Sequence, residues 1–244
     1  MKGFYEAEGL KTEIVRFQGL QGDSVGTGKI DVTGDHIATM LIPAINGVKM
    51  KFTTGIHSGC KSLCVLNDSP YKTTRDLIGK TFAIPDGIGA SDQNITMRFL
   101  ANDGLDPLKD VKYKVAEPGA AVLAMKAGEI QCAILGDQFI QPFLKDGTLR
   151  VIRSLTHDDD FKIEACCIHA VNLDFYEQNP ITVKKLTRAV VAGIFKYFDY
   201  SITDKATEET LKRIIKDYKT FGLLPKNLDN DEALKRVWDP VLTH

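Results

Sequence analysis

The sequence predicts an α/β protein made of two similar lobes, and two observations support this. Residues 28–35 are nearly repeated by residues 128–137: each segment has a Gly-charged-Ile turn, a short apolar run and a final Gly-Asp. The glycine can end one helix, the apolar run fits a buried strand, and the aspartate can cap the next helix. Strands and helices also alternate up to about residue 172, which is typical of parallel βαβ sheets.

The individual elements follow from apolar periodicity and from the residues that start and stop helices. Strands are expected at 11–17, 50–56, 62–66, 81–85, 111–115, 131–135, 149–154 and 163–171. Helices are expected from 35 or 36 to 46, from 73 or 74 to 79, and at 91–102, 119–127, 137–145, 181–200, 207–218 and 231–238. For example, Asn46-Gly47 and Asp103-Gly104 mark helix ends, and apolar residues alternate along 11–17. The last three helices form an all-helical tail that we expect to pack outside the sheets.

Composition narrows the functional classes. The 244 residues carry 31 Lys and Arg against 32 Asp and Glu, and this balance argues against nucleic acid as the main partner. No segment approaches the roughly 18 apolar residues of a membrane span, and no secretory leader is recognisable at the start. The five cysteines are an odd number in a mid-sized chain, which does not indicate a disulfide scaffold.

Two segments are expected to cross between the lobes, namely 61–69 and 162–171. The residues between them have their own strands and helices, so one lobe is inserted into the other through two strand-like connections. This is a hinge architecture. We therefore assign residues 1–67 and 167–244 to lobe one and residues 68–166 to lobe two.

Four motifs in order resemble substrate-binding proteins of ABC importers. They are Gly3-Phe4-Tyr5-x-x-Glu8-Gly9-Leu10, Gly28-Lys29-Ile30-Asp31-Val32, Asp76-Leu77-Ile78-Gly79-Lys80-Thr81-Phe82-Ala83-Ile84-Pro85 and Ala124-x-x-Ala127-Gly128-Glu129-Ile130. The most similar subgroup is the nitrate/sulfonate/taurine (NitT/TauT-like) type, which also includes binders of thiamine pyrimidine precursors.

The resemblance implies a type II periplasmic-binding-protein fold, with two α/β lobes joined by two hinge strands. It also implies a receptor that closes over a small ligand and docks to ABC permease subunits in the membrane. Such a receptor would be periplasmic or extracellular, and membrane-anchored if the full-length chain is a lipoprotein. No cofactor is expected.

The chain departs from this family at its start. A leader and a first strand normally precede the Gly-Phe motif, whereas here only two residues do. We therefore expect lobe one to have an incomplete sheet with an exposed edge. The protein is expected to be a monomer unless that edge pairs, and a version extended upstream is expected to be more stable.

A glycine-rich loop at 86–93 follows a strand and opens a helix. Its glycines allow close backbone approach, and the first N–H groups of a helix favour an anion. Ser91 or Asp92 is expected to be the N-cap. Because Asp92 would repel an anion, a small polar organic molecule with an anionic or amide group is favoured over a bare inorganic ion. The candidate ligand residues of this loop are Gly89, Ala90, Ser91, Asp92 and Gln93.

Three further groups are expected at the cleft edge between the lobes. Asp35 and His36 in lobe one match Gly136, Asp137 and Gln138 in lobe two, and each aspartate could instead cap its helix. His57, Ser58, Gly59 and Cys60 end a strand just before the first crossing. The imidazole of His57 can donate or accept near neutral pH.

Cysteines gather in or beside the two crossings, with His169 close to them. Cys60, Cys64, Cys166 and Cys167 could form a disulfide, a soft-metal site or simply buried thiols. Since consecutive strand residues point to opposite faces, Cys166 and Cys167 are not expected to share one site. The tract His157-Asp158-Asp159-Asp160 is interpreted as a solvated loop, and no metal ligand is assigned.

Three functions remain open at this point. The first is the solute receptor, and the second is an enzyme on the same bilobal fold, of the menaquinone-pathway or pyrimidine-synthase kind. The third is a metal-binding or redox protein that uses the crossing thiols. No catalytic triad order, Walker loop or zinc-hydrolase helix is found in the sequence.

Overall fold

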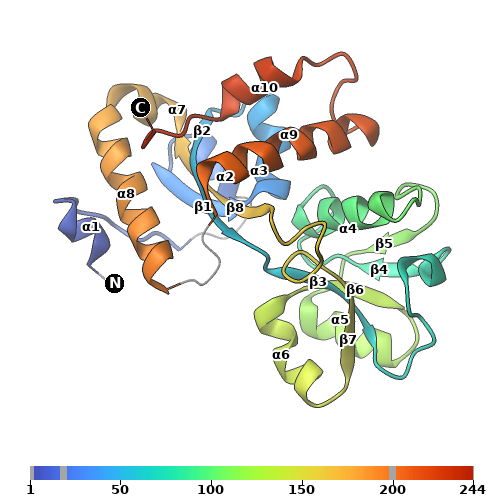
Figure 1. Cartoon of the computed structure of the whole chain (residues 1–244). Helices are drawn as coiled ribbons and strands as arrows, with labels where there is room; N and C mark the ends of the chain where they lie inside the picture. The colour runs from blue at the N-terminus through green and yellow to red at the C-terminus, as the bar shows by residue number, and fades with distance from the viewer. Residues whose placement is uncertain (1–2, 17–20, 198–201, 244) are drawn as a thin grey trace. The chain divides into compact units, whose positions relative to one another are not determined.

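The computed structural model describes residues 3–16, 21–197 and 202–243, and it divides into two compact units (Figure 1). Unit 1 is Met1–Ser58 with Ile163–His244, and unit 2 is Gly59–Lys162. The chain thus passes between units at 58–59 and again at 162–163. No helix among the described residues is long and apolar enough to span a bilayer.

Unit 1 is built on a three-stranded sheet with the order β1-β8-β2, and β8 runs antiparallel to both neighbours. Its strands are β1 (Val32–His36), β2 (Met50–Ser58) and β8 (Ala165–Asn172). Its helices are α1 (Phe4–Ala7), α2 (Gln21–Gly26), α3 (Ile37–Ile45), α7 (Leu173–Gln178), α8 (Pro180–Tyr197), α9 (Asp204–Thr220) and α10 (Asn230–Val237).

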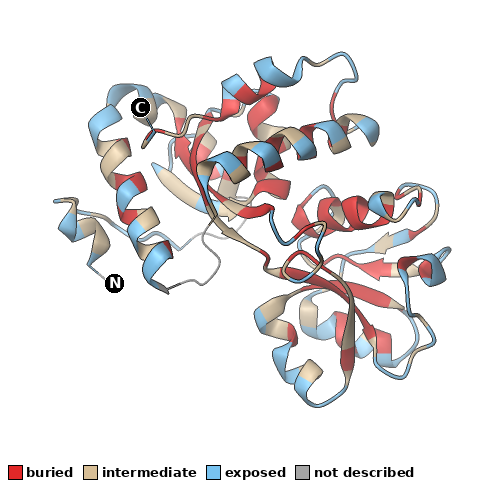
Figure 2. Cartoon of the chain, viewed as in Figure 1, coloured by how far each residue is buried: buried red, intermediate tan, exposed pale blue. Residues whose placement is uncertain are grey.

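The core of unit 1 lies between this sheet and helices α3, α9 and α10. Phe52 of β2, Ile168 of β8 and Tyr218 of α9 are fully buried there, and the red segments of Figure 2 follow the same elements. The Tyr218 hydroxyl donates to the Ala38 carbonyl (3.2 Å), and Trp238 forms a bridge with Phe52. The C-terminal helices are therefore part of the core of unit 1 and cover its sheet.

Unit 2 has a five-stranded mixed sheet with the order β5-β4-β6-β3-β7. Strand β4 is parallel to β5 and β6, and β3 is antiparallel to β6 and β7. The strands are β3 (Lys61–Leu66), β4 (Thr81–Ala83), β5 (Lys112–Lys114), β6 (Cys132–Gly136) and β7 (Leu149–Ser154). The helices are η1 (Thr74–Leu77), α4 (Ser91–Asn102), α5 (Pro118–Lys126) and α6 (Asp137–Lys145).

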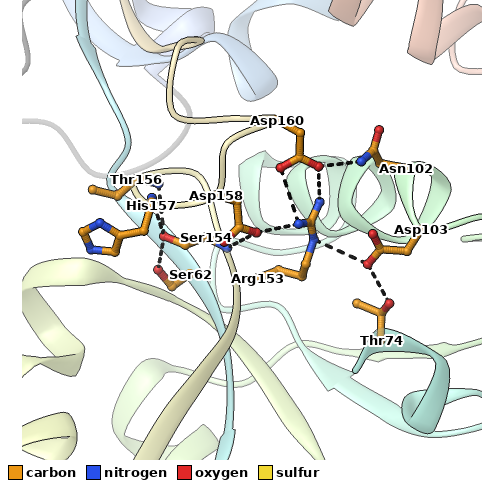
Figure 3. A network of polar contacts seen from close by, with 10 residues as sticks. All are labelled: Ser62, Thr74, Asn102, Asp103, Arg153, Ser154, Thr156, His157, Asp158 and Asp160. Atoms are coloured by element: carbon orange, nitrogen blue, oxygen red, sulfur yellow. Dashed lines mark hydrogen bonds and ion pairs between the residues drawn. The ribbon is translucent and has the colours of Figure 1, made fainter. Parts of the chain in front are cut away.

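One arginine ties the end of β7 to its surroundings in unit 2 (Figure 3). Its guanidinium pairs with Asp158 (2.6 Å) and Asp160 (2.6 Å), and it lies 5.4 Å from the ring centre of Phe99. This residue is Arg153, and Asp158 also accepts from the backbone N–H of Ser154 (3.0 Å). The expectation of a solvated 157–160 loop is therefore wrong for Asp158 and Asp160, because a partly buried cation needs carboxylate partners.

The predicted repeat corresponds to a repeated helix-strand-helix unit, α2-β1-α3 and α5-β6-α6. Gly28 and Gly128 both end the first helix with left-handed backbone, at φ 72° and 78°. The N–H of Lys29 donates to the Ser24 carbonyl (3.0 Å), and that of Glu129 donates to the Ala124 carbonyl (3.0 Å). These are the bonds with which a left-handed glycine closes a helix.

Two expectations about the elements are wrong, and two short helices were not predicted. Residues 11–16 form no strand, since no described strand pairs with them, and residue 17 lies outside the described residues. The sheets are not uniformly parallel, because β8 and β3 run against their neighbours. Helices α2 and α7 were not predicted; both are short and lack a clear apolar period. Residues 198–200 of the expected 181–200 helix also lie outside the described residues.

Gly55 of β2 provides a test of packing in unit 1. A Cβ on this residue would lie 2.6 Å from Ile202 Cγ2 and would also clash with the Thr207 hydroxyl, which donates to the Thr203 carbonyl (3.0 Å). We expect Gly55→Ala to lower the free energy of unfolding by about 1–3 kcal/mol in urea titrations. Gly119→Ala in α5 is the control, because no atom lies within 4 Å of the added Cβ. An unchanged Gly55→Ala protein would contradict this packing.

Candidate functional site

In unit 2, sheet topology brings three segments to one edge. The parallel strands β4 and β6 end at this edge, and β3 begins there, because Lys61 lies opposite Gly136 in the register. The loop after β4, the start of α6 and the first residue of β3 are therefore neighbours. Ligands of open α/β sheets bind at such a carboxyl edge.

A buried lysine is the centre of this edge. Lys61 Nζ lies 2.6 Å from Asp86 and forms a second ion pair with Asp92, whose side chain is fully buried. Burial raises the pKa of Asp92 to about 6, although the attraction of Lys61 opposes this. Burial alone would lower the pKa of Lys61, but the two carboxylates outweigh it and the pKa lies above its usual value.

The glycine-rich loop is folded around the same carboxylates. Gly87 and Gly89 have φ of 100° and 77°, which only glycine adopts readily. The Asp86 N–H donates to the Asp92 carboxylate (2.7 Å), and the Gly89 N–H donates to the Gln93 side-chain oxygen (2.7 Å). The loop and the first turn of α4 thus hold one another in place.

The expected cap of α4 is wrong. The N-cap is Ala90, whose side chain makes no cap bond, and Ser91 and Asp92 are the first helical residues. Ser91 is fully buried and its hydroxyl donates to Asp86, while Asp92 is paired with Lys61. These side chains are taken inward by the buried lysine, so they are not available to cap the helix. A bulky residue at position 91 would therefore disturb the fold.

Asp137, at the start of α6, is held by hydroxyl groups of unit 2. Its carboxylate accepts from Ser62 (2.6 Å) and from Thr156, and its N–H donates to the Cys60 carbonyl (2.9 Å). The N-cap is Gly136 and makes no side-chain cap bond, so helix capping by Asp137 is wrong. A Cβ at Gly136 would meet no atom within 4 Å, and Gln138 is exposed.

Two of the predicted residues form the turn that starts unit 2. Gly59 and Cys60 have φ of 76° and 103°, and Cys60 is the one non-glycine residue with positive φ in the described chain. Its N–H donates to the Thr156 hydroxyl (2.9 Å). Such backbone costs roughly 1–3 kcal/mol and persists where its surroundings fix it.

In unit 1, the other predicted residues meet at one edge of the sheet. Strands β1 and β2 end there and β8 begins there, so His36 and His57 both lie opposite Cys167 in the register. The Asp35 carboxylate accepts from the His36 N–H (2.7 Å), and is therefore not the cap of α3. His57 Nδ1 contacts the Ser58 carbonyl (3.1 Å).

The two consecutive cysteines approach the same imidazole. His36 Nδ1 lies 3.3 Å from Cys166 Sγ and 3.6 Å from Cys167 Sγ. The expectation that they could not share a site is therefore wrong, because the β2–β8 pairing shifts register at His57 and Ser58 and the strand is irregular there. Cys166 is disulfide-bonded and Cys167 is a free thiol, whereas Cys64 and Cys132 are buried free thiols.

His169 does not join this group. It is buried in the unit 1 sheet, and its Nδ1 lies 2.7 Å from the Thr53 hydroxyl, which accepts from Thr187 (3.1 Å). No described residue is hydrogen-bonded to its Nε2. Burial lowers the pKa of His169 to about 4.

Lys61 is the important residue that sequence reasoning missed. Its signal was a lysine at the start of an otherwise apolar run, Lys61-Ser62-Leu63-Cys64-Val65-Leu66. A lysine in such a place either lies in solvent at the end of the strand or is a buried cation paired with carboxylates. The carboxylates that distinguish the two cases lie about thirty residues later in the chain.

The carboxyl group of Asp92 should titrate at an unusually high pH. It binds its proton near pH 6 in the native state, against about 3.9 when unfolded. Between these values the native state binds more protons, so this group adds stability as the pH falls from about 6 to about 4. A carboxyl 13C titration should show a midpoint near 6 that Asp92→Asn removes; a midpoint near 4 would contradict the burial argument.

His169 should make stability depend on pH in the opposite direction. Its native pKa of about 4 lies below the unfolded value of about 6.5, so the unfolded state binds more protons between them. Its contribution to stability is lost as the pH falls through this window. In urea titrations at pH 7 and at about pH 4.5, near the acidic end of the window, His169→Asn should lose less stability on acidification than wild type. The exposed His157→Asn is the control, and equal losses in both variants would refute the assignment.

No curated protein sequence matches the chain. Among solved structures, the nitrate-binding protein NrtA from Synechocystis PCC 6803 matches with a TM-score of 0.72 and 16% identity, covering 99% of this chain and 82% of that one. The aliphatic sulphonate-binding protein SsuA from Escherichia coli matches with a TM-score of 0.65 and 19% identity, covering 90% and 80%.

A third structure is similar at still lower identity. It is a Candida albicans protein described as having the generic periplasmic binding protein fold, with a TM-score of 0.74, 11% identity and coverage of 98% and 90%. These likenesses confirm the predicted type II periplasmic-binding-protein fold. The model of the NMT1/THI5-like family matches residues 1–199. The chain therefore belongs to the NMT1/THI5-like family.

Proposed function

We propose that this protein is the solute-binding receptor of an ABC import system. Its family and fold support this, since structures of the same fold include sulphonate- and nitrate-binding proteins. A receptor of this kind acts in the periplasm or outside the cell and delivers its ligand to permease subunits. Its proposed ligand site is the carboxyl edge of unit 2 described above.

The start of α4 indicates the class of ligand. This 12-residue helix begins beside the glycine-rich loop, and no described residue accepts a bond from the N–H groups of Ser91, Asp92 or Gln93. Free N–H groups and the helix dipole favour a negative group. Asp92 repels a negative ligand group less than an unpaired carboxylate would, because Lys61 pairs with it.

The same edge also offers an acceptor. The Asp86 side chain is 42% exposed, so its carboxylate can receive a donor from a ligand in addition to its bonds with Lys61 and Ser91. A ligand with an anionic group and a nearby N–H or O–H donor fits both features. This favours a small polar organic anion over nitrate.

An enzyme on the same fold is the second candidate. The observation in its favour is the free thiol of Cys167, whose sulfur lies 3.6 Å from His36 Nδ1, because solute binding does not require a thiol beside an imidazole. Mass spectrometry of ligands after incubation separates the two candidates: a receptor returns them unchanged, whereas an enzyme converts them.

Gly136→Leu tests the ligand site without disturbing the fold. Gly136 has φ −64°, which any residue adopts, and an added side chain enters open space at the carboxyl edge. The probes are MOPS as an organic sulfonate, an aminopyrimidine, and nitrate, measured by calorimetry. We expect an organic probe to bind wild type, nitrate not to bind, and Gly136→Leu to weaken binding at least about tenfold because its side chain fills the site.

Ala127→Leu is the matched control. This alanine is exposed and lies at the end of α5, just before β6 begins, so it is at the opposite end of that strand from Gly136. It should bind as wild type does. Equal affinity of the two variants, with both folded, would show that the site lies elsewhere.

A further inference from the structure

Unit 1 has a groove that the proposed ligand site does not use. Its volume is about 630 Å³, and it lies between the N-terminal segment Leu10–Val15 and the segment Lys29–Thr33, which leads into β1. Residues of α7 and α8 close it, among them Phe175 and Leu186. The groove therefore runs along the outer edge of the sheet.

The outer edge of β1 offers backbone groups for pairing. The Asn172 N–H donates to the Asp31 carbonyl (2.8 Å), so Asp31 and, by alternation, Thr33 bond inward to β8. Val32 and Gly34 then point their N–H and C=O groups outward. No described strand pairs with this edge, and Gly34 is exposed.

The opposite wall of the groove is itself a strand-forming sequence. Lys11-Thr12-Glu13-Ile14-Val15-Arg16 is rich in β-branched residues, yet it forms no backbone hydrogen bond with any described residue. Ile14 is 67% exposed and Val15 is 54% exposed. Neither side chain is therefore covered by the described residues of one copy.

The segment and the edge are complementary in one antiparallel register. When Val15 is placed opposite Val32, Ile14 falls opposite Thr33 and Arg16 falls opposite Asp31. This brings two β-branched pairs and one pair of opposite charges together. The Arg16–Asp31 pair occupies a non-hydrogen-bonded position of the new ladder, where facing side chains are closest.

We propose that two copies of this chain associate by laying residues 11–16 of each on the outer edge of β1 of the other. The arrangement is an isologous dimer, in which each copy gives one strand and receives one. It pairs the outward groups of Val32 and Gly34 and covers Ile14 and Val15. Because only short strands are exchanged, the dimer is weak and reversible.

Charge exchange between copies tests this directly by sedimentation velocity over a wide range of protein concentrations. Wild type should show a monomer–dimer equilibrium. Arg16→Asp and Asp31→Arg should each raise the dimer dissociation constant about tenfold, because two pairs of like charges then face each other in every dimer. An equimolar mixture of the two variants should restore association, since each copy then meets its complement.

The controls separate the other outcomes. Ile14→Lys should also weaken the dimer, whereas Leu123→Lys, at 69% exposure on α5 of unit 2, should not. Unchanged melting temperatures show that the variants are folded. A monomer at every concentration overturns the proposal, and so does a mixture that fails to associate. If association returns only when both changes are in one chain, and not in the mixture, residues 16 and 31 pair within a single copy. That result also overturns the proposal.

Discussion

The ion pairs of Lys61 with Asp86 and Asp92 are the constraint on which the proposed ligand edge depends. Removing two charges from water costs several kcal/mol per ion, so the pair persists only because both carboxylates reach the lysine. Breaking one partner of such a buried pair destabilises a protein by roughly 3–5 kcal/mol. The same contacts turn Asp92 inward, fix the loop through the Asp86 N–H, and leave the first N–H groups of α4 without an acceptor among the described residues.

Both units contain the same helix-strand-helix arrangement. A helix ends at a left-handed glycine, a strand follows, and a second helix starts at the end of that strand, as Gly28 and Gly128 show. In unit 2 this strand is central and its end is fixed by Ser62 and Thr156 around Asp137. In unit 1 the corresponding strand is β1, which is at the sheet edge, and this difference creates the groove beside Lys29–Thr33.

Elements with strong local signals could be predicted from the sequence. Helix 91–102, helix 137–145 and strand 149–154 agree with α4, α6 and β7 to the residue, since helix stops and apolar runs mark them. Strand 11–17 failed because a strand needs a partner, and pairing is not encoded locally. The caps at Ser91 and Asp137 failed for a similar reason: their polar groups bond to residues distant in the chain. Lys61 was missed because its carboxylates come from another loop.

We propose that ligand binds at the carboxyl edge of unit 2, over the start of α4. The most direct measurement is an amide NMR titration of 15N-labelled protein with the organic anion that binds best. We expect saturable shifts of the Ser91, Asp92 and Gln93 amides, whose N–H groups begin α4, and of the Gly136 amide at the same edge of the sheet. Saturable binding that leaves those four amides unshifted would contradict it.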